Sequence, residues 1–275
     1  MYSTKLIMAE TATDAWESCF RVIMSEGETV ESRIGTTKHL TNVMVVMNHP
    51  ERGVCLSPVR NMSLRYMLGE LQWYMSGSNK VSDIAKFGKM WKDLSDDGET
   101  VNSAYGYRIF HQFGFDQLQH CIDKLKKNPY DRQAVIHIKT PSNIPTKDTP
   151  CTCHIQFTCF EGKLNAHVYM RSNDLWFGMP YDMAFFTTLQ QIVAQKTGLP
   201  LGEYVHTVGD MHIYEKHWSK YNDLLWQESA VEKFREERFA PWSWTKETPE
   251  NIQRMIDGEV PENLTLRYLK ELNNG

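Results

Sequence analysis

Residues 150–214 read PCTCHIQFTCFEGKLNAHVYMRSNDLWFGMPYDMAFFTTLQQIVAQKTGLPLGEYVHTVGDMHIY. Apolar and polar residues alternate over 152–160 and again over 163–171, which is the period of a half-buried strand. Glu161-Gly162 lies between the two runs and is typical of a tight hairpin turn. This part of the chain therefore predicts two paired strands.

A broadly apolar run follows the predicted hairpin, from Met179 to Val193. A helix that is apolar on most sides has no face suited to water, so we expect it to lie buried through the centre of the domain. Gly198 and Pro200 end it, and residues 204–209 predict another strand. A hairpin, a buried helix and a further strand indicate an α/β (α+β) fold.

The same periodicities predict further elements outside this stretch. Thr11 or Thr13 can cap the first helix, and Gly35 allows a turn in the segment Arg33–Thr37, which has the character of a loop. The residues after 214 are rich in tryptophan and charge and are expected to be helical. The expected elements are helices over residues 12–26, 62–76 and 115–127, and strands over 43–47 and 134–138.

Length and composition narrow the class of protein. The chain has 275 residues and no Gly/Ser/Pro-rich linker, so we expect one domain over 1–275 with a substantial core. The net charge is −4, and the dispersed Lys and Arg argue against a nucleic-acid polymer as partner. Six cysteines without framework spacing indicate reduced thiols. With no evident signal peptide or membrane span, we expect a cytoplasmic protein.

Cys151 is the candidate nucleophile. A lone cysteine is usually an inert core residue. However, Pro150 restrains the backbone beside it, and Arg171 and Ser172 end the strand that the hairpin pairs with it. A nearby cation favours the thiolate, which is the nucleophilic form, so a nucleophile is the favoured interpretation.

Glu70 is a candidate for proton transfer. It lies off the apolar stripe of its helix, with Tyr66, Trp73 and Tyr74 at three- and four-residue offsets. A carboxylate surrounded by aromatic rings loses hydration, which raises its pKa and suits it to exchange protons. From the helix alone, a boundary Glu that points to water is the more ordinary interpretation.

Asp182 allows two interpretations that the residues alone do not separate. Pro180 suits the first position of the long helix, and an acid in the first turn complements the helix dipole. The same position can direct a carboxylate into a cleft. Arg171, His212 and Tyr214 likewise have ordinary structural interpretations, as a strand-end cation and as core residues.

A zinc-dependent deaminase is a weak alternative. Such enzymes carry His-x-Glu and, later, Pro-Cys-x-x-Cys. This chain has His49-Pro50-Glu51 and Pro150-Cys151-Thr152-Cys153, but His154 stands where the last ligand should be, about a hundred residues beyond the first half. We therefore expect no metal.

These motifs occur in an order that resembles the thymidylate synthase superfamily over roughly residues 12–218. The resemblance implies a mixed sheet with a buried central helix and flanking helices. It implies catalytic roles for Cys151, Glu70, Asp182 and Tyr105, and contacts to a folate from Trp91, Asp174 and Gly178. Nucleotide binding is assigned to Arg33, Arg132, Arg171, Ser172, Asp182, His212 and Tyr214.

The resemblance also implies partners. They are a pyrimidine nucleotide, 5,10-methylenetetrahydrofolate, and a second copy of the chain, whose phosphate site would receive Arg132 in a homodimer. Three features depart from the family pattern: Gln133 replaces an arginine, Leu94 replaces a tryptophan, and the end of the chain does not look like the segment that closes over folate. A catalytically inactive nucleotide- or RNA-binding member is a further alternative, which the complete Cys-Glu-Asp set argues against.

Asp182 stands where thymidylate synthases carry Asn. With Asp at this position, the chain resembles the deoxycytidylate hydroxymethylase branch. An Asn amide matches the N3–H and O4 of uracil, whereas a carboxyl group can accept from the amino group of cytosine. The expected substrate is therefore dCMP and the expected product 5-hydroxymethyl-dCMP. A methylating enzyme, or one that acts on dUMP, remains an alternative.

Overall fold

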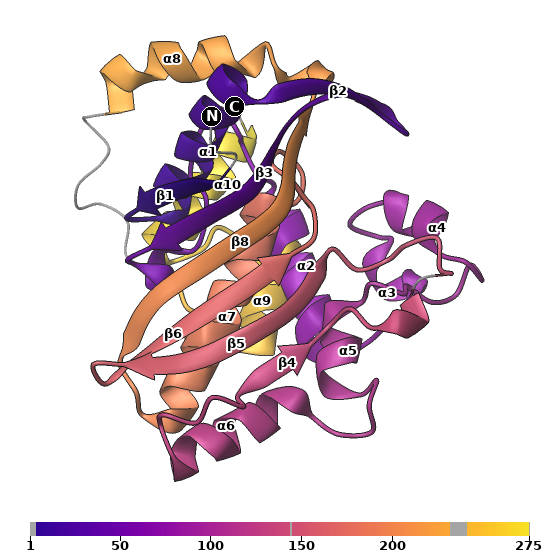
Figure 1. The fold of residues 1–275 in the computed structure, drawn as a ribbon, viewed down its shortest axis with the longest axis vertical. Coiled ribbons are helices and arrows are strands. Elements are labelled where there is room, and N and C mark those ends of the chain that lie inside the picture. The colour runs from indigo at the N-terminus through magenta and orange to yellow at the C-terminus, as the bar shows by residue number, and fades with distance from the viewer. Residues whose placement is uncertain (1–3, 144, 232–240, 275) are drawn as a thin grey trace.

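The fold is built on one mixed β-sheet. A computed structural model describes residues 4–143, 145–231 and 241–274, and within them the sheet has eight strands (Figure 1). Its main order is β1-β3-β8-β6-β5-β4, with β2 paired to β3 and β7 to β8. The strands are β1 (Lys5–Ala9), β2 (Glu28–Ser32), β3 (Gly35–Met47), β4 (Val135–His137), β5 (Thr152–Phe160), β6 (Lys163–Met170), β7 (Asn173–Asp174) and β8 (Leu201–Tyr214).

The sheet contains both parallel and antiparallel pairs. β1 is parallel to β3 and β6 is parallel to β8, while β3–β8, β5–β6 and β4–β5 are antiparallel. The β5–β6 hairpin turns at Glu161-Gly162, where both residues have positive φ, as the sequence predicts for a two-residue turn. The fold predicted from the sequence is confirmed.

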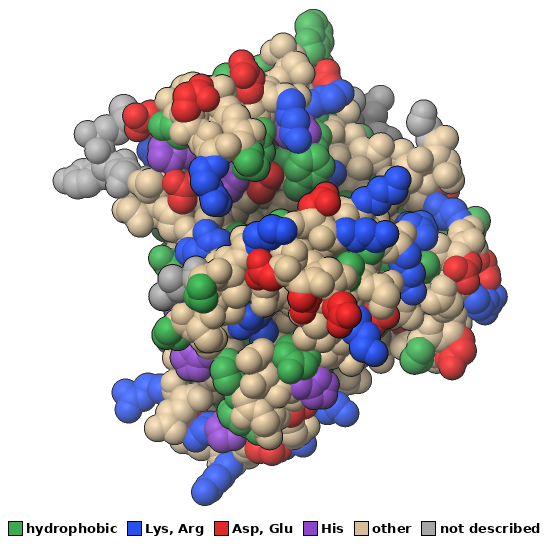
Figure 2. Space-filling model, turned by 90° about the vertical axis from the view of Figure 1, so that its right-hand side faces the viewer, with side chains coloured by type: hydrophobic (Ala, Val, Ile, Leu, Met, Phe, Trp, Pro, Cys, Tyr) green, Lys and Arg blue, Asp and Glu red, His purple; other side chains and the backbone are tan. Residues whose placement is uncertain are grey.

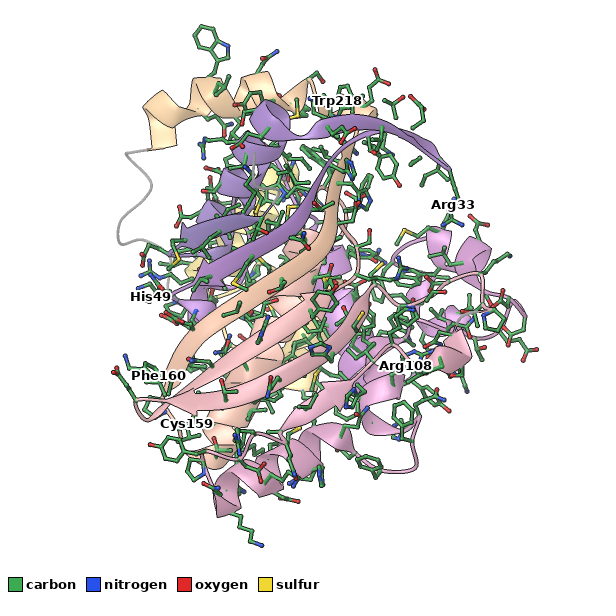
Figure 3. All side chains as sticks on the ribbon, viewed as in Figure 1. Arg33, His49, Arg108, Cys159, Phe160 and Trp218 are labelled. Atoms are coloured by element: carbon green, nitrogen blue, oxygen red, sulfur yellow. The ribbon has the colours of Figure 1, made fainter. Side chains whose placement is uncertain are left out.

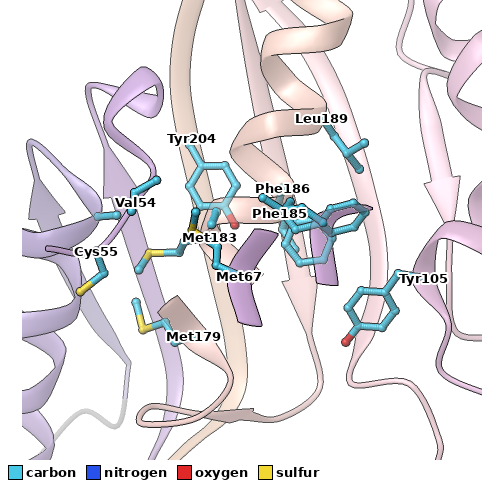
Figure 4. Close-up of a cluster of buried hydrophobic side chains, with 14 of the residues drawn as sticks. Val54, Cys55, Met67, Tyr105, Met179, Met183, Phe185, Phe186, Leu189 and Tyr204 are labelled. Carbon is cyan, nitrogen blue, oxygen red and sulfur yellow. The ribbon is translucent and has the colours of Figure 1, made fainter. Parts of the chain in front are cut away.

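Helices cover one face of the sheet, and the helix α7 lies at its centre (Figure 1). It packs on β6 and β8, and its buried residues Met183, Phe185 and Phe186 meet Tyr204 and Tyr105 in the core (Figure 4). The helices are α1 (Ala12–Glu26), α2 (Leu64–Ser76), α3 (Val81–Ile84), α4 (Met90–Leu94), α5 (Tyr105–Phe110), α6 (Gln117–Lys127), α7 (Met179–Thr197), α8 (Lys220–Val231), α9 (Pro249–Ile256) and α10 (Leu264–Asn274).

Several strands differ from those predicted from the sequence. Arg33–Thr37 is not a loop throughout, because β3 begins at Gly35 and runs thirteen residues to Met47. β8 extends on both sides of the predicted 204–209, and β1 was not predicted. These segments are strands because they have partners: β3 pairs with β1, β2 and β8 along its length.

The surface carries charges of both signs. Figure 2 shows one side of the molecule, with lysine and arginine side chains interspersed with acidic ones. None of the described helices is both long enough and apolar enough to cross a membrane.

Candidate active site

Cys151 lies immediately before β5, next to a bulge between Thr152 and His154. Arg171 supports this end of the strand, since its guanidinium donates to the carbonyls of Thr149 (2.8 Å) and Pro150 (3.1 Å). Arg171 lowers the pKa of the thiol as expected, but burial has the larger opposite effect and raises that pKa to about 11. The arginine alone therefore does not make Cys151 a thiolate at neutral pH.

Glu70 is buried, so the interpretation that it points to water is wrong. The Tyr66 hydroxyl donates to its Oε1 at 2.8 Å, and the indole N–H of Trp91 donates to that hydroxyl at 3.2 Å. Burial raises the pKa of Glu70 to about 8, the Tyr66 hydrogen bond opposes the rise, and the charge of Asp182 adds to it. A carboxyl group with this pKa can hold or release a proton near neutral pH.

Asp182 belongs to the first turn of α7 and makes a specific contact there. The side-chain amide of Asn173 donates to its Oδ2 at 2.8 Å. Burial raises the pKa of Asp182 to about 7, although the Asn173 hydrogen bond acts in the opposite direction. A helix-start acid with no other role needs no such partner, whereas Asp182 is half-buried and bound to Asn173.

Electrostatic effects between these groups show that they lie near one another. A charge on either Asp182 or Cys151 raises the pKa of the buried Tyr105 hydroxyl, and burial raises it most. Asp182 also raises the pKa values of both Cys151 and Glu70. The structure thus brings Cys151, Glu70, Asp182 and Tyr105 together from four separate elements.

Several polar side chains lie next to these residues, where β7 pairs with β8. Ser172 Oγ lies 3.4 Å from His212 Nδ1, and the rings of His212 and Tyr214 meet edge to face. Asp174 pairs with His212 across β7 and β8, and its Oδ1 accepts the backbone N–H groups of Trp176 and Phe177. Burial raises the pKa of Tyr214, as does the charge of Asp174.

The two remaining arginines lie at different distances from this group. Arg33 is exposed at the tip of the β2–β3 hairpin, at the opposite end of the sheet from Cys159 and Phe160 (Figure 3). Its charge lowers the pKa of Tyr214, against the larger effect of burial, so the guanidinium lies near that residue. Arg132 lies farther from Cys151: its carbonyl accepts from the side chain of Gln156, which is five residues or about 16 Å along β5 from Cys151.

Gly178, predicted to contact a folate, lies against the Asn173–Asp182 pair. A Cβ there would come within 2.8 Å of Asn173 Nδ2 and 3.2 Å of Asp182 Oδ2. Contacts that close require a neighbour to move, so glycine at this position leaves room for the hydrogen bond between them. Its role toward a folate remains a prediction.

Residues that the sequence interpretation did not single out complete the site. Asn173 and the Tyr66 hydroxyl hold the two carboxyl groups; the sequence placed Tyr66 near Glu70 at i, i+4 spacing, but neither hydrogen bond was predicted. Arg60 is buried, lies over the rings of Trp176 and Tyr181, and leaves its Nε without a partner among the described residues. No signal in the sequence marks Arg60 as buried.

The two histidines that suggested a zinc site contact different sets of residues. His49 pairs with Glu10 and Glu51, and His154 stacks on Tyr169 in the sheet. Within the described parts of the chain, no three His, Cys, Asp or Glu side chains are grouped so as to hold a metal ion. The deaminase alternative gains no support.

Comparison with known protein families gives one match. A family model described as Thymidylate synthase matches residues 14–237, which include every site residue discussed above. The match also covers the strands and helices that position those residues, from α1 to α8. We conclude that the chain belongs to the thymidylate synthase family, whose members transfer a one-carbon unit from methylenetetrahydrofolate to a pyrimidine nucleotide.

Proposed function

We propose that the protein converts dCMP to 5-hydroxymethyl-dCMP. The observation that carries this proposal is the half-buried Asp182 carboxyl, which the Asn173 amide holds and which lies close enough to Cys151 and Glu70 to raise the pKa of each. A carboxylate offers only acceptors, which suits the amino group of cytosine and opposes the O4 of uracil. Because the site is buried, such a mismatch is costly, and discrimination can reach on the order of 10⁴.

The covalent step is assigned to Cys151. The Cys151 thiol gives its proton to water, the thiolate adds to C6 of the base, and the π electrons of the C5=C6 double bond shift to make C5 a carbon nucleophile. As this happens, N3 gains a proton. Asp182 suits this transfer because its pKa of about 7 lies close to the working pH. Arg171 opposes the effect of burial on the thiol, so it assists the loss of the thiol proton.

Glu70 and Tyr105 are assigned to proton handling on the other side of the base. Glu70 has a pKa of about 8 and is anchored by Tyr66, so it can orient a water and exchange protons with it. The nucleotide itself is assigned to polar groups around the same space. We propose that Arg33, Arg171 and Ser172 bind its phosphate and that His212 and Tyr214 bind its sugar.

The residues present fit a folate. Tetrahydrofolate combines a flat ring system with carboxylates, and it supplies the one-carbon unit that C5 attacks. The positively charged guanidinium of Arg60 lies over the rings of Trp176 and Tyr181, which suits an anionic ligand with a ring system. Trp91, Asp174 and Gly178 are proposed to contact the ring system.

Water, rather than hydride, is proposed to complete the reaction. Leu94, half-buried in α4, is smaller than the tryptophan common in the family, and we propose that it leaves more room at the folate end of the site. The C-terminal helix α10 docks on the start of α2, where Asn273 Oδ1 accepts the Leu64 N–H at 2.9 Å. We propose that the space beside Leu94 admits water to the one-carbon unit.

Product analysis tests this proposal directly. The purified protein is incubated with dCMP and methylenetetrahydrofolate, and the mass of the nucleotide and the absorbance of the folate are recorded. Addition of water gives a hydroxymethyl nucleotide and tetrahydrofolate, whereas transfer of hydride gives a methyl nucleotide and dihydrofolate. Dihydrofolate that forms in step with product would contradict the hydroxymethyl assignment, and turnover of dUMP alone would contradict the cytosine assignment.

A homodimer with a shared site is proposed from the place of Arg132. Within one chain it is too distant to reach a phosphate held by Arg171, since it lies far along β5 from Cys151. The sheet face opposite the helices bears none of the described helices (Figure 1) and carries half-buried His154, His167 and Tyr169. That face suits a second copy of the chain.

One domain over 1–275 and a cytoplasmic location likewise remain predictions.

Subunit mixing tests the shared site. Cys151→Ser and Arg132→Ala chains are each expected to be inactive. After exchange, about a quarter of the wild-type activity should return, because each hybrid dimer has one site with both groups. Activity is measured after native mass spectrometry has shown that hybrids form.

Arg171→Ala provides the matched control for that experiment. Arg171 contacts the loop before Cys151 of its own chain, so mixing it with Cys151→Ser should restore nothing. Hybrids that show no recovery with Arg132→Ala would contradict the shared site. Equal recovery with Arg171→Ala would also contradict it.

A further inference from the structure

A continuous chain of buried hydrogen bonds ends at Asp182. Tyr204 Oη lies 2.8 Å from His206 Nδ1, His206 Nε2 lies 2.9 Å from Asn173 Oδ1, and Asn173 Nδ2 lies 2.8 Å from Asp182 Oδ2. Tyr204 and His206 alternate on the core side of β8, and both are fully buried; Asn173 is 3% exposed. Figure 4 shows Tyr204 reaching from β8 toward α7, the helix that carries Asp182.

Only one direction of donation satisfies this chain. The Tyr204 hydroxyl proton has no acceptor among the described residues except His206, so Nδ1 must accept and Nε2 must carry the imidazole proton. The Asn173 oxygen then accepts from Nε2, which leaves its amide N–H to face Asp182. Burial lowers the pKa of His206 to about 3, so the ring stays neutral and cannot donate from both nitrogens.

This direction of hydrogen bonding determines which oxygen of the Asp182 carboxyl group can hold a proton. Oδ2 of Asp182 is held as an acceptor whether the group is ionised or neutral. Donation from an amide makes Oδ2 the less basic oxygen, so a proton gained by Asp182 resides on Oδ1. Gly178 belongs to the same arrangement, because any side chain there would press on the Asn173–Asp182 contact.

We propose that Tyr204, His206 and Asn173 form a positioning network that fixes the orientation of Asp182 and places its exchangeable proton on the oxygen that faces the pyrimidine. This proposal rests on the proposed role of Asp182 in binding the base. The three residues do not touch the nucleotide. They determine which oxygen accepts from the amino group and exchanges a proton with N3, and so contribute to the choice of base.

The first test needs no substrate. The ¹³C resonance of the Asp182 carboxyl carbon, assigned with Asp182→Asn, is titrated in wild type, Tyr204→Phe and Asn173→Ala. Loss of the Asn173 donor removes a hydrogen bond to the ionised form, so the midpoint should rise in Asn173→Ala. It should rise less in Tyr204→Phe, where His206 becomes free to adopt the other tautomer. An unchanged midpoint in both folded variants would overturn the network.

Thr207→Val is the matched control. Thr207 is the neighbour of His206 on β8 and lies 2.8 Å from His167, on the opposite face of the sheet. The substitution removes a hydroxyl–histidine contact of equal length without touching the network. It should leave the Asp182 midpoint at its wild-type value, and a shift as large as that of Tyr204→Phe would contradict the assignment.

Turnover provides the second test. The ratio kcat/KM for dCMP should fall roughly tenfold in Tyr204→Phe and more in Asn173→Ala, with the alkaline limb that depends on the Asp182 proton displaced to higher pH. In an Asp182→Asn background the Tyr204→Phe effect should vanish, because the network acts only through Asp182. An equal effect in both backgrounds would mean a merely structural role. If wild type turns out to act on dUMP, the proposed function fails, yet the carboxyl titration still decides the network.

Discussion

Replacement of Cys151 by serine abolishes turnover of dCMP and leaves dCMP binding largely intact. Only the covalent step is lost, since the proposed contacts to phosphate, sugar and base do not involve the sulfur. We expect kcat to fall by at least roughly 10³-fold, because a serine hydroxyl without an adjacent base is a far weaker nucleophile. Single-turnover kinetics measure the loss, and calorimetric titration with dCMP measures the retained binding.

Cys153→Ser is the control for this result. Cys153 lies two residues away in the same bulge, with its sulfur 4.0 Å from the Cys151 carbonyl. It should retain most of the wild-type activity. Activity lost in Cys153→Ser and retained in Cys151→Ser would move the nucleophile to Cys153, and activity retained in both would remove the covalent mechanism.

Asp182→Asn should exchange the preferred base. The amide preserves size and the start of α7, but it offers a donor to the O4 of uracil and an acceptor to its N3–H. Cytosine loses the partner that shares a proton with N3. The ratio of kcat/KM for dUMP over dCMP should therefore rise by orders of magnitude, mainly through loss of dCMP turnover, since Asp182 is assigned to the transition state as well as to binding.

Two comparisons make this prediction decisive. If Asp182 only complements the helix dipole, the substitution should cost about 1 kcal/mol of stability and leave the ratio unchanged. Asp174→Asn alters a nearby acid that is assigned to the folate, so it should lower both activities without changing their ratio. An unchanged ratio in folded Asp182→Asn would remove the cytosine assignment.

The buried carboxyl groups show why the structure was needed to choose between interpretations. From its helix, Glu70 was expected to face water, because one helix shows only its own neighbours. The structure buries it against Tyr66, which is four residues away, and beside Asp182, which is more than a hundred residues away. Its pKa of about 8 is a property of that assembly, and no local pattern encodes it.

The thiol illustrates the same limit. A cation near Cys151 was predicted correctly, since hairpin pairing brings the end of β6 to the start of β5. The net direction of the pKa shift of this thiol was not predicted correctly, because the desolvation of a thiol depends on everything packed around it. Here burial outweighs Arg171, and the pKa of Cys151 rises.

The sequence by itself determined the hairpin, the buried central helix and the family. Each of these depends on a local period, on a turn residue such as Gly162, or on motifs in a particular order along the chain. Only the tertiary structure decided the full lengths of β3 and β8, the burial of Glu70, and the hydrogen-bonded chain from Tyr204 to Asp182. The reason is that strand pairing, desolvation and hydrogen-bond direction depend on partners brought together by folding, and the partners lie far apart in the sequence.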